Sequence, residues 1–140
     1  MFPRGLARVA VVLEIFLGVG AVGGGLLLAL APDGHLLRMP ITLLATTPFR
    51  TFFVPGLILL TLVGIVPLLA ATLAVRRHAL APLAAMAVGL TLVGWITVEM
   101  VMLAGFGSLA WAAYLVLGTS IVAVGVAWRS ASRRSKSLKS

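Results

Sequence analysis

The long apolar runs of this chain constrain its fold more than any other feature. The first run covers residues 6–30 and carries Glu14 among its few charged side chains. A helix rises 1.5 Å per residue, so a run of about 25 residues exceeds the roughly 30 Å hydrocarbon thickness of a bilayer. Similar runs cover residues 52–75, 79–104 and 109–128. Because backbone polar groups inside a bilayer must be satisfied within each segment, the sequence predicts an all-α bundle of four transmembrane helices.

The composition supports the membrane interpretation. Hydrophobic residues make up 61% of the chain and charged residues 10%, with a mean hydropathy of +1.19. Soluble domains are only about 45–50% apolar. The chain has no cysteine, which excludes disulfides and thiolate metal sites. A cleaved signal peptide is an alternative for the first run, but Glu14 and the length of the run oppose it.

The segment between the first two runs is predicted to lie in the outer membrane interface. Pro32-Asp33-Gly34 has the composition of a turn and should end the first helix. Residues 35–50 are too short and too interrupted by prolines to cross a bilayer. Inside the second run, Pro67 removes a backbone hydrogen bond and should kink the helix.

The positive charges orient the predicted bundle. Nine of the 11 lysines and arginines lie near the termini or in the loop at residues 76–77, whereas Arg38 and Arg50 lie in the interfacial segment. By the positive-inside rule, both termini should be cytoplasmic. The basic, serine-rich residues 129–140 are predicted to form a disordered tail that attracts anionic lipid. The tail has no aromatic side chains for stacking on bases, so nucleic acid is not an expected partner.

Glu14 is one of two acids predicted to lie inside the membrane. Gly18, Ala21 and Gly25 follow it at spacings of four, seven and eleven residues, which place the acid on the smallest face of its helix. That face should point into the bundle. A charged residue at this depth costs about 2.5–3.5 kcal/mol to insert, and such residues are usually functional. Glu14 is therefore either a proton, cation or ligand site, or a structural glutamate that is protonated or bonded to a basic neighbour.

Glu99 is the second acid, and it shares a helical face with Trp95 near the other end of the third run. At 1.5 Å per residue, the two acids differ in depth by about 15 Å or more, so they cannot form a carboxylate pair. Two interpretations stay open. Arg38 or Arg50 could form a salt bridge with Glu99 that locks the interfacial segment over the bundle. Alternatively, Glu99, Trp95, Arg50 and His35 could line an outward-facing polar pocket.

Small residues spaced four apart indicate helix packing. Gly20 and Gly24 form a GxxxG pair, and Ala85 and Gly89 form a similar pair in the third run. We expect these residues to pack inside the bundle, and contact with another subunit is the alternative. The full set predicted to pack is Gly18, Gly20, Gly24, Gly25, Ala85 and Gly89.

Several short motifs resemble those of a known group of proteins. They are Leu-Glu-Ile-Phe-Leu-Gly-Val-Gly-Ala in the first run, Thr-Pro-Phe before the second, Val-Pro-Gly-Leu inside it and Gly-Trp-Ile-Thr-Val-Glu in the third. The group consists of uncharacterised small four-helix bacterial membrane proteins that are loosely DoxX-like, and the resemblance covers about residues 10–125. It implies a four-helix bundle in the bacterial plasma membrane, sometimes associated with redox partners, and it transfers no catalytic residue. Small multidrug transporters also have four helices and a membrane glutamate in the first, a similarity that rests here on Glu14 alone.

The sequence contains no pattern typical of an enzyme. It shows no nucleophile beside a base and no phosphate-binding loop, and His35 and His78 are predicted on opposite sides of the membrane, where they cannot share a metal. We therefore predict a non-enzymatic accessory or interaction subunit that contacts lipid and other membrane proteins, or copies of itself. The alternative is a small oligomeric transporter coupled to protons through Glu14. A quinone-handling redox subunit is a third possibility, although no pattern indicates a particular cofactor.

Overall fold

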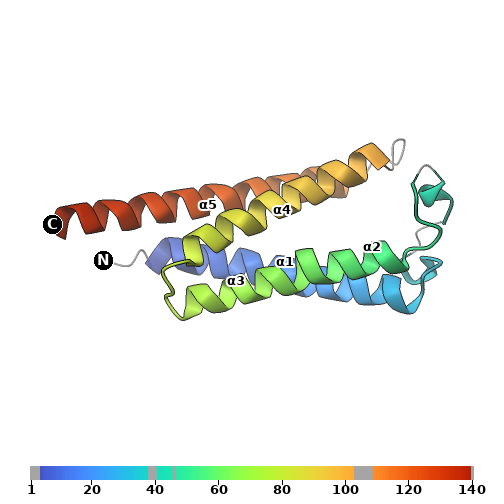
Figure 1. The fold of residues 1–140 in the computed structure, drawn as a ribbon, viewed down its shortest axis with the longest axis horizontal. Helices are drawn as coiled ribbons and strands as arrows, with labels where there is room; N and C mark the ends of the chain where they lie inside the picture. Colours follow the sequence, from blue (N-terminus) through green and yellow to red (C-terminus); the bar gives the residue numbers. More distant parts are fainter. Residues whose placement is uncertain (1–3, 38–40, 46, 103–108, 140) are drawn as a thin grey trace.

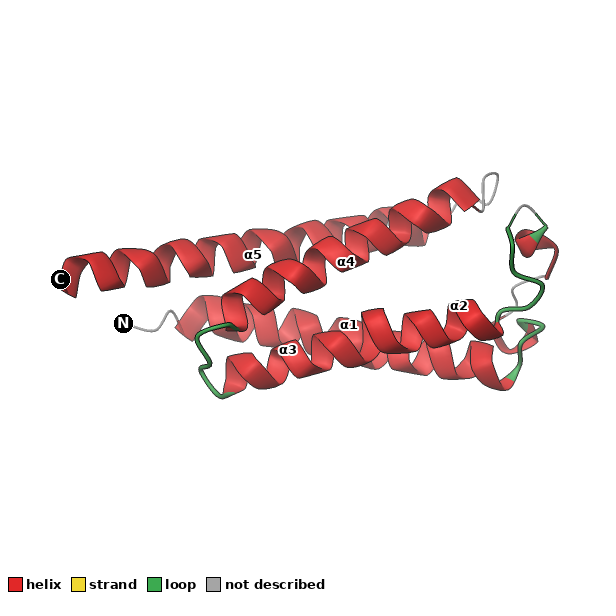
Figure 2. Ribbon diagram, in the orientation of Figure 1, coloured by secondary structure: helices red, strands yellow, loops and turns green. Residues whose placement is uncertain are grey.

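The structure is a computed structural model of the chain, and it describes residues 4–37, 41–45, 47–102 and 109–139. The described residues form helices and turns, without a strand. Four helical segments are long and apolar enough to cross a membrane, which confirms the prediction of four apolar helices (Figure 1, Figure 2). These segments are α1 (Arg4–Leu30), the second segment (Phe53–Val75), α4 (Ala81–Met102) and the greater part of α5 (Leu109–Lys139).

Both termini lie at one end of the bundle, together with the loop between the second segment and α4 (Figure 1). We call this the basal end, and the opposite end the distal end. The distal end carries two short 3₁₀ turns, η1 (His35–Leu37) and η2 (Ile41–Leu44), where a single interfacial segment was predicted. Leu44 of η2 packs with Leu28 and Phe52, so this segment closes over the end of the bundle.

The second segment is not a uniform α-helix. It consists of α2 (Phe53–Ile58), a π-helix η3 (Leu59–Ile65) and α3 (Val66–Val75). Pro67 is the second residue after the π-helix and has no N–H to donate to the preceding turn. Because a missing bond in the ladder favours local widening of the helix, Pro67 explains the position of η3.

The bundle consists of two hairpins, each held together at glycines. The first hairpin joins α1 to the second segment, where a Cβ added to Gly25 would lie 2.7 Å from the carbonyl oxygen of Gly56. The second hairpin joins α4 to α5, where a Cβ added to Gly89 would lie 2.6 Å from the carbonyl oxygen of Gly118. At these distances only glycine fits. The two hairpins meet through contacts of α3 with α4 and of α1 with α5.

The glycines that make these contacts differ partly from those predicted. A Cβ added to Gly18 would lie 2.9 Å from the Gly64 carbonyl oxygen, so Gly18 packs as expected, as Gly25 does. Gly24 meets only a methyl carbon of Leu59, at 3.6 Å, and Gly20 meets no atom within 4 Å. Gly18 and Gly25 lie two turns apart on one side of α1. Because a helix turns 100° per residue, Gly20 faces away from that side. The GxxxG pair therefore does not form the internal contact, whereas Ala85 is fully buried.

The basal core is built from one large side chain and several small ones. Trp128 of α5 is 0% exposed and packs among Ala7 and Ala10 of α1, Ala74 of α3 and Ala81 at the start of α4. The alanines leave the space that the indole ring fills. All four segments therefore contribute to a single basal cluster.

Helix α5 continues through the basic residues to Lys139, where a disordered tail was predicted from residue 129. Extending an existing helix avoids the cost of nucleation, and arginine, lysine and alanine are good helix formers. These two effects outweigh the basic, serine-rich composition on which the prediction of disorder rested.

Candidate functional site

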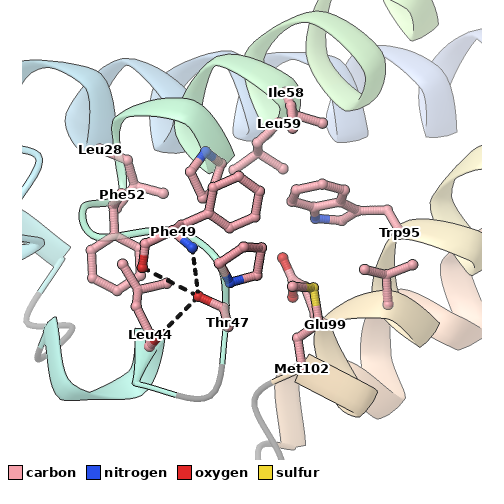
Figure 3. Close-up of a pocket in the computed structure, with 13 residues that line it drawn as sticks. Leu28, Leu44, Thr47, Phe49, Phe52, Ile58, Leu59, Trp95, Glu99 and Met102 are labelled. Atoms are coloured by element: carbon pink, nitrogen blue, oxygen red, sulfur yellow. Dashed lines mark hydrogen bonds between the residues drawn. The ribbon is translucent and has the colours of Figure 1, made fainter.

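A cavity of about 220 Å³ lies at the distal end, between α4 and the first hairpin (Figure 3). Helix α4 lies close to α3 at the basal end and diverges from the first hairpin toward the distal end (Figure 1). The wall is mostly apolar, and Glu99 is the one charged residue among the described residues that line it. Its main contributors are Leu28 from α1, Phe49 and Phe52 from the loop, Leu59 from η3, and Trp95 and Glu99 from α4.

A small hydrogen-bonded turn holds the loop wall of this cavity in place. The Thr47 hydroxyl donates to the carbonyl oxygen of Leu44 at 2.8 Å, and the backbone N–H of Phe49 donates to the same hydroxyl at 3.2 Å (Figure 3). Pro48 between them restricts the backbone further. The phenyl ring of Phe49 is thereby positioned against the cavity, next to Phe52.

Trp95, Glu99 and Met102 face the cavity because spacings of four and three residues place them on one side of α4. The Trp111 side chain of α5 hydrogen-bonds the Glu99 carboxylate, and an indole nitrogen can only donate. Trp95 lies beside the same carboxylate (Figure 3), yet its Nε1 is buried without a hydrogen-bond partner in the described part of the chain. The Glu99 carboxylate is therefore hydrogen-bonded on the side that faces α5, and its opposite side faces the cavity.

The basic residues expected near Glu99 are not in this site. Arg50 is exposed, does not line the cavity and forms no ion pair with Glu99. Arg38 lies outside the described residues. His35 pairs with Asp33 instead, because both side chains belong to the same turn after α1. Of the predicted polar pocket, the structure therefore brings together Glu99 and Trp95, in a cavity that is mainly apolar.

Asp33 is stabilised in its ionised form by this turn. The backbone N–H of His35 donates to Oδ1 of Asp33 at 3.1 Å, and the His35 ring nitrogen Nδ1 contacts the same oxygen. The backbone hydrogen bond, followed by the side-chain one, lowers the pKa of Asp33. This pair caps the turn and takes no part in the cavity.

Glu14 is a second, separate candidate site. Its side chain is 1% exposed, and neither carboxyl oxygen has a hydrogen-bond partner within the described ranges. Gly18, Ala21 and Gly25 are buried on the same face of α1, as their spacing predicts. Arg8 and Arg76 are exposed, and neither forms an ion pair with Glu14. A buried acid without a hydrogen-bond partner among the described residues is unusual in so apolar a helix, and an acid buried inside a membrane is usually functional.

Sequence patterns did not reveal all of the residues at the distal cavity. Trp111 fits an aromatic belt at the membrane interface, but the structure turns it toward Glu99. The short connection between α4 and α5 is the signal that could have suggested this contact. Two antiparallel helices joined by a brief turn place residues at equal distances from that turn side by side. Phe49 and Phe52 carry no comparable signal.

Metal binding finds no support in the described ranges, which contain no group of three or more His, Asp or Glu side chains that could hold an ion. Comparisons with protein-family models, curated proteins and solved structures gave no match to this chain.

Proposed function

We propose that the protein is a non-enzymatic interaction subunit of a larger assembly in the bacterial plasma membrane. In this proposal the four segments span the bilayer with both termini in the cytoplasm. Two features support the orientation. Both termini and the loop at residues 76–77 lie at the basal end (Figure 1), and nine of the 11 lysines and arginines belong to these regions.

The observation that carries the interaction function is the open glycine face of α1. Gly20 and Gly23 are exposed, and an added Cβ at either position would meet no atom within 4 Å. Phe16, one turn before Gly20, is 69% exposed. In membranes, helices associate where small residues let two backbones approach closely. A helix from another protein fits this face, with its side chains over the glycines.

Substitution of Gly20 by leucine tests the proposal. Leucine at this position fits the isolated bundle, because the surrounding space is open, but it blocks close approach of a second helix. Gly94→Leu is the matched control, since Gly94 of α4 is equally exposed and open. Native mass spectrometry of protein extracted gently from its own membrane should show other membrane proteins bound to the unmodified chain and to Gly94→Leu.

Those partners should be lost from Gly20→Leu. A chain that travels alone or only as a homodimer would contradict the proposal. Equal loss of partners from both variants would also contradict it, because the α1 face would then have no special role.

Proton-coupled transport through Glu14 is the second candidate function, and the unbonded, buried carboxyl group of Glu14 favours it. Liposomes that contain the protein and a trapped pH-sensitive dye should equilibrate an imposed pH difference faster than empty liposomes. Glu14→Gln keeps the shape of the side chain and removes the ionisable group, so it should abolish this acceleration. A variant that assembles normally and leaves proton movement unchanged would exclude transport through Glu14.

A further inference from the structure

The distal cavity combines one acid with an apolar wall. Glu99 is the one charged residue among the described residues that line the cavity. Arg50 of the neighbouring loop forms no ion pair with it. Trp111 holds the carboxylate from the α5 side. The charge of this cavity is therefore complementary to a cation that enters it and not to an anion.

The apolar wall indicates what kind of cation fits. Phe49, Phe52 and Trp95 bring three aromatic rings to the lining, and ring faces attract organic cations, most strongly where water is excluded. A metal ion suits the site poorly, since hard cations need about six oxygen ligands and the wall offers few oxygen atoms. An ammonium group attached to an apolar body matches both the carboxylate and the rings.

The volume limits the size of the ligand. An engineered cavity of about 150 Å³ binds benzene, and sites for drug-sized molecules measure about 300–1,000 Å³. The distal cavity, at about 220 Å³, lies between these values. It accommodates a single ring or a short branched chain together with one ammonium group.

We propose that the distal cavity binds small amphipathic organic cations, with Glu99 as the charge partner and Phe49, Phe52 and Trp95 as the apolar and aromatic walls. This site is separate from the Gly20 face and does not depend on the interaction function. It also differs from the Glu14 site, because Glu14 does not line the cavity.

Equilibrium dialysis with the full chain in lipid nanodiscs tests the proposal. The probe is benzyltrimethylammonium, and the comparison ligands are its neutral carbon isostere neopentylbenzene and the anion phenylmethanesulfonate. Empty nanodiscs correct for partition into lipid. We expect the cation to bind about tenfold more tightly than the neutral isostere, and the anion to show no specific binding. Equal affinity for the cation and the isostere, or preference for the anion, would overturn the proposal.

Two variants and a control locate the binding site. Glu99→Gln should remove the preference for the cation and leave the neutral isostere almost unaffected. Ile58→Trp should fill the cavity and weaken the cation and the isostere together. Asp33→Asn is the matched control, because it also removes an acid but Asp33 does not line the cavity, and it should bind the cation as the unmodified chain does. Cation binding that survives both cavity variants, or that is lost in Asp33→Asn, would overturn the assignment. If a variant fails to fold, the preference of the unmodified chain for the cation over the neutral isostere still decides the question.

Discussion

Replacing Gly89 with alanine should weaken the contact between α4 and α5. An added Cβ at Gly89 would lie 2.5 Å from a methyl carbon of Val122 and 2.6 Å from the carbonyl oxygen of Gly118. The methyl group can rotate away, but the backbone oxygen cannot. The helices must therefore separate by about 0.8 Å to bring the 2.6 Å contact to the 3.4 Å at which ordinary contacts begin.

Two effects determine the change in the free energy of unfolding. Overpacking of a close contact costs about 1–3 kcal/mol, and the higher helix propensity of alanine returns up to about 1 kcal/mol. Gly94→Ala on the same helix separates the two effects, since a Cβ at Gly94 meets nothing within 4 Å. Gly94→Ala should be slightly stabilising, and Gly89→Ala should be less stable than Gly94→Ala by about 1–3 kcal/mol.

The measurement is reversible unfolding in mixed micelles by titration with sodium dodecyl sulfate, followed by far-UV circular dichroism. Both variants should show the helical content of the unmodified protein before the transition. If Gly89→Ala and Gly94→Ala unfold at the same detergent fraction, the inferred close approach at Gly89 is wrong.

Three further predictions concern other parts of the chain. Arg77 has a φ of 55° just after α3, where the backbone N–H of His78 donates to the carbonyl oxygen of Leu73. Glycine adopts this left-handed conformation without the strain that a Cβ causes. Arg77→Gly should therefore raise the free energy of unfolding by about 0.5–1 kcal/mol in the same titration. A loss of stability would show that the Arg77 side chain matters more than its backbone strain. Asp33 is the only aspartate, so carbon-13 labelling of its carboxyl group allows a pH titration by nuclear magnetic resonance, with a midpoint expected below the ordinary value of about 3.9. The stability that ionised Asp33 gives to the turn should be complete above that ordinary pKa and should be lost as the pH falls through the lowered pKa. A midpoint at or above about 3.9 would refute the hydrogen bonds to His35. Trp128→Ala should cost about 3–5 kcal/mol, because the ring is fully buried among alanines that cannot fill the space, and a loss below about 1 kcal/mol would contradict that packing.

The sequence was sufficient to predict the four segments and the inward face of Glu14. Segment length and hydropathy are properties of the chain itself, so they need no knowledge of neighbours. The spacing of Glu14, Gly18, Ala21 and Gly25 likewise depends only on the period of the helix, and the structure buries all four. The prediction of which small residues pack was less successful, because Gly20 shares the GxxxG spacing but lies on the opposite side from Gly18.

Features that depend on two elements at once were beyond the sequence. The π-helix η3 changes which side chains of the second segment face α1, and no local sequence pattern predicts the length of η3. The distal cavity forms because the loop bearing Phe49 closes against a helix pair that diverges from the first hairpin (Figure 1). Local patterns do not encode that divergence.

The pairing of neighbouring segments through glycines has a consequence for the order of assembly during synthesis. Gly18 and Gly25 meet residues of the segment that directly follows α1, and Gly89 meets residues of the segment that directly follows α4. Each hairpin therefore has its close contacts as soon as its second helix leaves the ribosome. The first hairpin can form before the second is made, and the later hairpin then docks on a surface that already exists. A chain organised in this way exposes few unpaired helices at any moment of its synthesis.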